Sequence, residues 1–589
     1  MERNEVALQD KWKVEDLFPD DEAWEKAFAE LSKKTNFDCY RGTLHTVENL
    51  LSYFHAQEEV SNEAMLVYLY AFLKHDEDVR VSKYNGYLGK VMSFFTAFQS
   101  ATAFDMPEIM SLPEETLRAF AEDERLRDYD YRILRMIAQK KYVLSEAEER
   151  ILAQAQEPMS AAGDAFEMLD NAELNLPEIE FEGKKVPLSH GLYSVIINGK
   201  DREKRKEAFK LYYGAYRKIL GTLATTYYGN VKNDIFLKNV RGYDSCLQMA
   251  LFEEDVDRSV YDNLVMCVGD NVGILHRYMA VRKRVLGYDE LHMYDVAPSI
   301  VENAELSLSY EEAFELVLKG LAPLGEEYIS LLKRAKEERW IDVYETEGKR
   351  NGAYSIGIYG THPYVLLNYQ KTAHDVFTIA HELGHSMHSY FSNLNQPVSK
   401  ADYKIFVAEV ASTVNEVLLL KYLLKTTEDT TLKKYLLTYY MDMFRTTLFR
   451  QTQFAEFEER AHALAEQGEP LNKDNLSELY YELNKKYYGD AVTQDEDIAI
   501  EWSRIPHFYR SFYVYKYATG ITAAICIAGK ILKNGQPAID NYFKFLSGGA
   551  STDPVSLLKI AGADLSDPQT FSAAMGEFED ALQQFEALI

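Results

Sequence analysis

The chain has 589 residues, 47% of them hydrophobic and 27% charged, so it is long enough for a large core and for more than one domain. Its formal net charge of -29 argues against a nucleic-acid-binding surface. The four cysteines are scattered, without a Cys-x-x-Cys pair, and indicate neither a disulfide framework nor a cysteine-zinc site.

The sequence shows no signal for export and no segment that is long and apolar enough to span a membrane. The N-terminal stretch MERNEVALQDKW is charged and has no apolar core of the signal-peptide kind. The longest apolar run, GITAAICIAG at 520–529, is about half of a membrane span. We therefore expect a cytoplasmic protein with no membrane or nucleic-acid partner, and the sequence leaves its oligomeric state open.

In chain order, the elements are mainly helices. DDEAWEKAFAEL at 20–31 has apolar residues at helical spacing behind aspartates that can cap the helix start, and similar patterns recur to about residue 175. IEFEGKKVPLS at 179–189 predicts a hairpin, and NGAYSIGIYGTHPYVLLNY at 351–369 predicts strands. Long helices return after residue 400. The chain is thus expected to be mainly α with a small sheet.

Residues 381–388 read HELGHSMH and lie in a predicted helix over 372–391. At 100° per residue one side of this helix is apolar, and His381, His385 and His388 gather on the opposite side, with Glu382 about a quarter turn from them. His-x-x-x-His on a helix puts two imidazoles within reach of one Zn²⁺, and Glu382 beside them can reach a water molecule there. HExxH also arises by chance, so this motif alone favours a zinc site without establishing it.

A zinc site of this kind needs a third protein ligand and an open position. His388 is seven residues from His381, about 10 Å along a straight helix, which argues against it as a ligand. FVAEVASTVNEVLLL at 406–420 predicts a second helix with Glu409 and Glu416 on its polar side. Either glutamate can meet the first helix across an antiparallel packing, and the spacing does not choose between them.

Several long blocks, in one order, resemble the thimet oligopeptidase family of zinc metallopeptidases and its bacterial branch, oligoendopeptidase F. These are KWKVEDLFPDDEAWEKAF, GKRNGAYSIGIYGTHPYVLLNY, FTIAHELGHSMHSYF, FVAEVASTVNE, LFRQTQFAEFE and HFYRSFYVYKYATG. The resemblance covers nearly the whole chain. It implies that His381, His385 and Glu409 bind one Zn²⁺ and that Glu382 is catalytic, which leaves His388 and Glu416 as outer partners or alternative ligands.

The resemblance also implies a fold and an activity. The fold is a multi-helix, two-lobed, zincin-like metallopeptidase with a small sheet beside the active-site helix and a deep central channel. The implied regions are 1–110, an N-terminal helical region; 111–195, a helical subdomain of the oligoendopeptidase F type that ends in the hairpin; and 196–589, the catalytic domain. The activity is hydrolysis of internal bonds of short peptides.

Two flanking blocks are candidates for substrate binding. An edge strand in 351–369 can pair with an extended peptide, which the resemblance favours near Gly352, Gly357 and Gly360, although an ordinary small sheet explains the pattern equally well. HFYRSFYVYKYATG at 507–520 is rich in aromatic residues and is also typical of a core stripe. The better-known branch of the family has a glycine-rich spacing in this block, and this chain does not.

The family pattern carries over to His507 as an oxyanion-stabilising donor, and we expect Tyr515 and Tyr517 to assist it and Tyr513 to contact substrate. The alternative function is a non-catalytic helical peptide-binding protein with a structural metal. Such a site would be closed by four protein ligands, whereas the sequence offers three and an intact Glu382.

Overall fold

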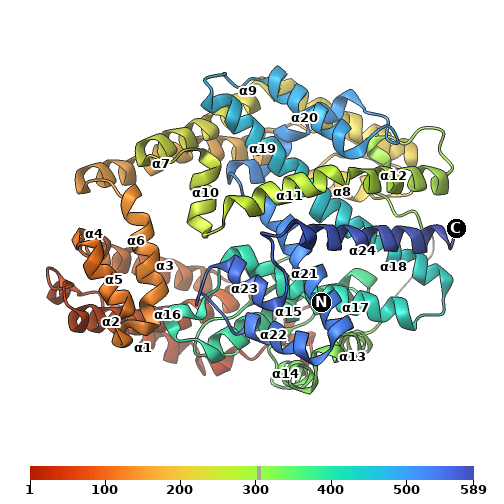
Figure 1. Ribbon diagram of the computed structural model, residues 1–589. Helices are drawn as coiled ribbons and strands as arrows, with labels where there is room; N and C mark the ends of the chain where they lie inside the picture. Colours follow the sequence, from red (N-terminus) through yellow and green to blue (C-terminus); the bar gives the residue numbers. More distant parts are fainter. Residues whose placement is uncertain (302–306) are drawn as a thin grey trace. The chain divides into compact units, whose positions relative to one another are not determined.

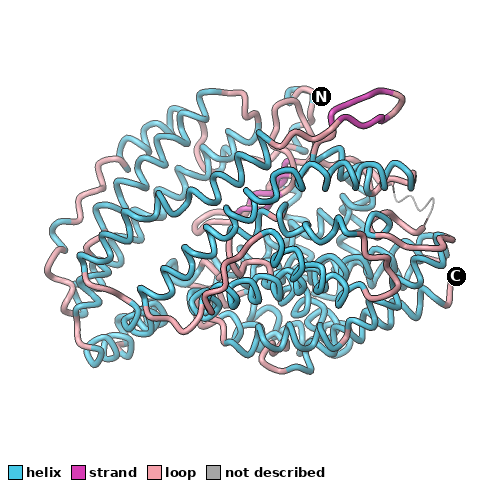
Figure 2. Tube along the Cα trace, turned by 90° about the horizontal axis from the view of Figure 1, so that it is seen from above, coloured by secondary structure: helices cyan, strands magenta, loops and turns pink. Residues whose placement is uncertain are grey.

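Helices make up most of the chain, and strands occupy only small parts of it, as the sequence predicted. The structure is a computed structural model that describes residues 1–301 and 307–589 (Figure 1). Figure 2 shows the same chain coloured by secondary structure, with helix predominating over strand.

The chain divides into two compact units, each assembled from three separate segments. The first unit comprises Met1–Val143, Glu305–Tyr422 and Ile527–Gly562, and the second comprises Leu144–Ala304, Leu423–Cys526 and Ala563–Ile589. Each unit takes residues from more than one of the regions 1–110, 111–195 and 196–589, so that division by sequence stays a prediction.

The first unit contains the HELGH segment and both helices expected to build the metal site. Its helices are α1 (Asp21–Leu31), α2 (Val47–Glu77), α3 (Ser82–Thr102), α4 (Asp105–Ser111), α5 (Glu114–Glu122), α6 (Asp130–Gln139), α13 (Tyr310–Leu321), α14 (Glu326–Glu337), α15 (Ala373–Asn395), α16 (Val398–Ala401), α17 (Ala408–Thr426), α22 (Gln536–Leu546) and α23 (Pro554–Ala561). The last residues of α17 belong to the second unit.

The second unit contains the aromatic block at 507–520. Its helices are α7 (Glu146–Met168), α8 (His190–Ile197), α9 (Arg202–Arg241), α10 (Cys246–Glu254), α11 (Arg258–Asp270), α12 (Val272–Leu286), α18 (Thr430–Met443), α19 (Arg450–Glu466), α20 (Lys473–Tyr488), α21 (Tyr515–Asn534) and α24 (Pro568–Glu586). The C-terminal residues of α21 belong to the first unit.

Both predicted strand segments are confirmed. β1 (Glu178–Phe181) and β2 (Lys184–Pro187) form an antiparallel hairpin, whose turn at Glu182 and Gly183 has positive φ angles of 51° and 76°. In the first unit, β5 (Tyr364–Leu366) pairs in parallel with β3 (Ile341–Asp342) and antiparallel with β4 (Tyr354–Ile356), in the order β3-β5-β4. β4 is therefore an edge strand.

Local sequence explains where α1 starts and what it buries. The side chain of Asp20 accepts a hydrogen bond from the backbone N–H of Ala23, which caps the helix as expected. Trp24 and Leu31 are then buried in the core of the first unit, together with aromatic residues of α2 and α3. The helical spacing thus identified the buried face.

None of the helices in the described residues combines the length and the apolar content that a membrane span needs.

Candidate metal centre

α15 carries the HELGH segment and starts at a capping box. The hydroxyl of Thr372 accepts a hydrogen bond from the backbone N–H of Asp375, whose carboxylate accepts one in return from the N–H of Thr372. The apolar face predicted from the sequence is buried, with Val376, Ile379, Ala380, Leu383, Met387 and Phe391 at most 3% exposed. This face fixes the rotation of α15, so His381 and His385 turn away from it.

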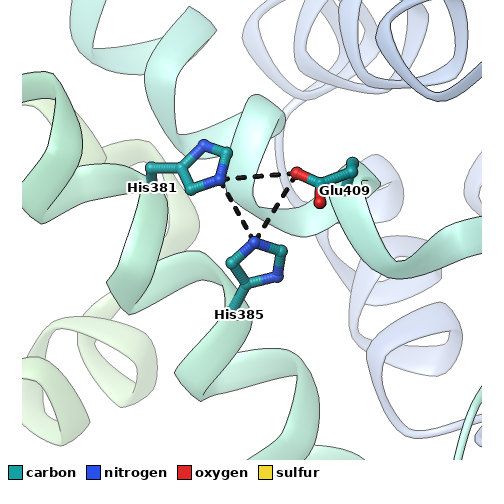
Figure 3. Close-up of side chains that lie close together, drawn as sticks. All are labelled: His381, His385 and Glu409. Carbon is teal, nitrogen blue, oxygen red and sulfur yellow. Dashed lines mark hydrogen bonds and ion pairs between the residues drawn. The ribbon is translucent and has the colours of Figure 1, made fainter. Parts of the chain in front are cut away.

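His381 and His385 lie one turn apart on α15 and point toward Glu409 of α17 (Figure 3). Nε2 of His381 lies 3.2 Å from Nε2 of His385 and 3.4 Å from Oε2 of Glu409, and Nε2 of His385 lies 3.6 Å from that same oxygen. Ligands held about 2.0–2.1 Å from a tetrahedral zinc ion are separated by about 3.3 Å. The three donor atoms therefore match one face of a zinc tetrahedron.

Gly384 lets α15 and α17 cross with their backbones in contact. A Cβ at this position would lie 2.5 Å from Cα of Ser412 and 2.7 Å from the carbonyl oxygen of Ala411, both on α17. The buried amide of Asn415 donates a hydrogen bond of 3.0 Å to the carbonyl of Ala380 near the same crossing. The crossing places Glu409 opposite the two histidines.

Gly384→Ala is expected to weaken zinc binding by more than about tenfold and to destabilise the protein by roughly 1–3 kcal/mol, because the methyl group must push α17 aside. Zinc affinity from competition with a chromogenic chelator, and thermal unfolding, check this. Gly529→Ala is the matched control, since Gly529 lies inside α21 and a Cβ there meets nothing within 4 Å. Unchanged zinc affinity in Gly384→Ala would show that the close crossing is unimportant.

Glu416 lies behind the cluster rather than in it. Its Oε1 is 2.5 Å from Nδ1 of His381, on the opposite side of the ring from the nitrogen that faces Glu409. A carboxylate in this position accepts the Nδ1–H and leaves Nε2 free to bind a metal. The structure thus separates the two glutamates that helical spacing alone could not distinguish, and it places Glu409, the one that the family resemblance implied, beside the histidines.

The electrostatics of the cluster suit a cation. Burial lowers the pKa of His381, but the carboxylates of Glu409 and Glu416 outweigh burial and raise this pKa to about 10. Burial raises the pKa of Glu409, but the hydrogen bonds with His381 and His385 outweigh it and lower this pKa. Imidazolium and carboxylate thus attract one another, and a metal ion would replace the proton as the positive charge.

Glu382 is next to His381 and is 7% exposed. Burial raises the pKa of its carboxyl group, an effect that His381 and His385 oppose. Within the described residues it lies outside the cluster of three donor side chains. Its position fits a side chain that would act on a molecule next to a bound metal ion, not one that would bind the ion itself.

His388 is in the core and does not face the cluster. Its ring stacks on Tyr403 at 3.7 Å between centroids with 4° between the planes, and lies 5.0 Å from the ring of Phe545. Burial lowers the pKa of His388 to about 3. The sequence predicted that His388 lies on a polar helix face. That prediction is wrong, because the rings of Tyr403 and Phe545 bury it.

The edge strand β4 lies against α15, the helix that carries His381 and His385. The hydroxyls of Ser355 in β4 and Ser386 in α15 are 2.8 Å apart. A Cβ on Gly357 would lie 2.5 Å from Cβ of Ser389, so only glycine lets this segment approach α15 closely. Gly352 and Gly360 instead have positive φ angles of 87° and 91°, which suit the turns that flank the strand.

In the second unit, part of the aromatic block lines a cavity of about 400 Å³, here called the His507 pocket. His507, Tyr513 and Tyr517 stand around it with ring centroids 5.5–6.2 Å apart. Burial, together with the positive charge of Arg510, lowers the pKa of His507, so its imidazole is neutral at neutral pH and can donate a hydrogen bond.

The other tyrosines of the block have different surroundings. Tyr515 is 1% exposed, and its ring packs edge-on against Tyr261. Tyr509 stacks on Phe166, and its hydroxyl lies 2.7 Å from that of Thr226. Tyr513 precedes α21 and Tyr517 lies in its first turn, and both line the pocket. Tyr515 is two residues from Tyr517 in the same turn, so it faces the other way, into the unit.

Sequence reasoning missed Gly384 and Asn415, which set the crossing of α15 and α17. A signal for Gly384 was present, since glycine inside a helix costs about 1 kcal/mol relative to alanine and so needs a packing reason. No comparable signal marks Asn415, whose amide oxygen accepts a hydrogen bond of 3.0 Å from the hydroxyl of Tyr328.

Comparison with known proteins links this geometry to one family. The profile of Peptidase family M3 matches residues 195–577, and that of Oligopeptidase F matches residues 108–175. The matched segments include the cluster of His381, His385 and Glu409, the edge strand and the residues that line the His507 pocket.

Individual relatives match over all or nearly all of the chain. Oligopeptidase PepF of Bacillus subtilis (strain 168) is 44% identical over 592 residues, which cover 100% of this chain and 88% of that protein. A crystal structure of a protein from Chlamydophila abortus has a TM-score of 0.94 at 36% identity and covers 100% of both chains. The crystal structure of oligoendopeptidase-F from Enterococcus faecium has a TM-score of 0.73 at 35% identity, covering 97% of this chain and 99% of that one.

Proposed function

The chain belongs to peptidase family M3, and on this premise we propose that His381, His385 and Glu409 hold one zinc ion per chain. The protein is a zinc-dependent metalloendopeptidase of the oligoendopeptidase F type. Glu416 orients His381 through the ring nitrogen that does not face the metal. A cytoplasmic location, expected from the sequence, stays a prediction.

The observation that carries the proposed site is the triangle of donor atoms with edges of 3.2, 3.4 and 3.6 Å. In the described part of the chain, these three side chains form the cluster without a fourth protein donor. A structural zinc site is closed by four protein ligands, whereas a catalytic site keeps one position for water or substrate. The geometry therefore favours catalysis over a peptide-binding protein with a structural metal.

In the proposed mechanism Glu382 moves the proton. When bound, zinc supplies a Lewis acid that polarises the peptide carbonyl and makes water acidic enough to react at neutral pH. Glu382 accepts the proton of the attacking water and delivers it to the leaving amine, which needs a carboxylate close to the ion but not bound to it. The two histidines and Glu409 keep the ion fixed during this transfer.

We assign the remaining roles to the edge strand and the His507 pocket. The outer edge of β4 in its sheet, in the segment that includes Gly352, Gly357 and Gly360, can pair with an extended peptide regardless of its side chains. His507 and Tyr517 are the proposed donors to the developing oxyanion, and Tyr513 contacts the substrate. The burial of Tyr515 argues for Tyr517 over Tyr515 in this role.

The proposed restriction to short peptides is tested with one sequence presented in two forms. A quenched fluorogenic peptide should be cleaved, and the same sequence placed in an exposed loop of a folded protein should be spared, because a deep channel admits an extended chain alone. Mass spectrometry of both digests locates the cut. Cleavage of the folded protein at a comparable rate would identify a general proteinase.

Glu409→Ala should lose zinc, whereas Glu416→Gln should keep it with affinity reduced by about 10–100-fold at most, because Glu416 contacts the metal only through His381. Metal content after dialysis against a weak chelator measures both. The result that counts against the ligand assignment is normal zinc content in Glu409→Ala.

His388→Phe is the matched control, because phenylalanine preserves the stack on Tyr403. This variant should keep full zinc occupancy. Zinc loss in His388→Phe equal to that in Glu409→Ala would mean that His388 belongs to the coordination sphere.

A further inference from the structure

The His507 pocket contains a cation that the chain itself does not neutralise. Arg510 lines the pocket, and its guanidinium carbon lies 4.9 Å from the ring centroid of Tyr513. Among the described residues no carboxylate lies within ion-pair distance of Arg510. Carboxylates are nevertheless plentiful in this chain, where Asp and Glu number 93 against 64 Lys and Arg.

Three other arginines of the same unit are paired with carboxylates of the chain. Arg217 pairs with Asp497 at 2.6 Å, Arg241 pairs with Glu149 at 2.9 Å, and Arg258 pairs with Glu459 at 2.8 Å. An exposed guanidinium that lines a pocket and lacks such a partner is available for a carboxylate from outside the chain.

The backbone on both sides of Arg510 is held in place. Its own N–H donates a hydrogen bond of 2.9 Å to the carbonyl of His507. The hydroxyl of Ser511 donates a bond of 2.6 Å to Asp234, and the N–H of Phe512 donates one of 2.9 Å to the buried Glu458. Phe512 has a φ of 57°, in the left-handed region that favours glycine, so these contacts maintain a strained turn.

Acidic residues of α7 also line the pocket. Asp164 and Glu167 of α7 line it, and the carboxylate of Asp164 accepts a hydrogen bond of 2.8 Å from Ser160. Neither is within ion-pair distance of Arg510 in the described structure. An entering carboxylate would be attracted to the Arg510 side and repelled from α7, so the pocket can orient the group that it binds.

We propose that the His507 pocket is a substrate subsite in which Arg510 binds a carboxylate of the peptide, and this inference rests on the proposed peptidase function. Two sources share this chemistry, namely an acidic side chain and the C-terminal carboxylate. A fork of N–H donors stacked on Tyr513 suits both. Arg510 thereby selects among peptides that the metal centre would otherwise cut alike.

The test compares peptides that differ only in one carboxylate. One series of quenched peptides carries Glu or Gln at each position in turn, and a second pair has a free or an amidated C-terminus. The natural zinc-loaded chain should prefer the carboxylate member by about tenfold in kcat/KM at one position or at the C-terminus, the size expected for one charge-assisted hydrogen bond at a partly exposed site. The position identifies the source.

Arg510→Gln should abolish this preference, and Arg510→Lys should keep part of it. The ratio within a peptide pair cancels effects common to both members, such as a change at His507. Arg258→Gln removes an equal charge from the same unit away from the pocket and should leave the ratio unchanged. Glu167→Gln removes the opposing charge and should raise the ratio.

Several outcomes would overturn the subsite. They are a carboxylate preference that persists in Arg510→Gln, the lack of any carboxylate preference in the natural chain, and a preference for the uncharged member of each pair that Glu167→Gln abolishes. In each case peptides are still cut, so the proposed function survives. If the natural zinc-loaded chain cuts no peptide at all, the proposed function itself fails.

Discussion

Glu382→Gln is expected to bind zinc as tightly as the natural chain and to hydrolyse peptides about a hundred to ten thousand times more slowly. Glutamine has nearly the same size, so it fits a position that is 7% exposed. Its amide cannot accept the proton of the attacking water, which removes general base catalysis. The measurements are kcat with a quenched peptide and zinc content of the same preparation.

Glu382→Asp provides the matched control. It keeps a carboxylate but withdraws it by one methylene, so it should retain more activity than Glu382→Gln. Loss of zinc from Glu382→Gln would instead mean that Glu382 is a ligand. Near-normal activity of that variant would mean that another group accepts the proton.

Removal of zinc by a strong chelator should reduce peptide hydrolysis at least a thousandfold, and one equivalent of zinc should restore it. The expected loss is large because the proposed nucleophile is a water activated by the ion. The metal-free protein should also unfold at a lower temperature, since an ion that binds only the folded state stabilises it in proportion to RT ln(1 + [L]/Kd). This second readout does not depend on activity.

Glu409→Ala is the control for the zinc experiment. Added zinc should not restore the activity of this variant, and it should raise the unfolding temperature less than it does for the natural chain. The reason is that one of the three donor side chains is missing. Full hydrolysis by natural protein that elemental analysis shows to be metal-free would exclude the proposed mechanism.

The aromatic block illustrates what the sequence could and could not predict. The pattern placed His507 and several tyrosines together, and the structure gathers His507, Tyr513 and Tyr517 around one pocket. The sequence favoured Tyr515 alongside Tyr517, yet Tyr515 is buried against Tyr261. The start of α21 decides this, because residues two apart at that point face opposite ways.

The sequence by itself determined the helices, their buried faces and the pair His381 and His385, because all of these depend on residues within a turn or two of one another. It also placed Glu409 and Glu416 on the same side of one helix, about 10 Å apart along the axis. Their spacing did not decide which of them reaches the histidines: the family resemblance implied Glu409, and the tertiary structure gives the physical reason. A helical pattern specifies rotation about the axis, whereas the axial position of a contact is set where two helices cross. That crossing lies at Gly384, against the backbone of Ser412, and it brings Glu409 to the donor triangle and Glu416 to the far side of His381.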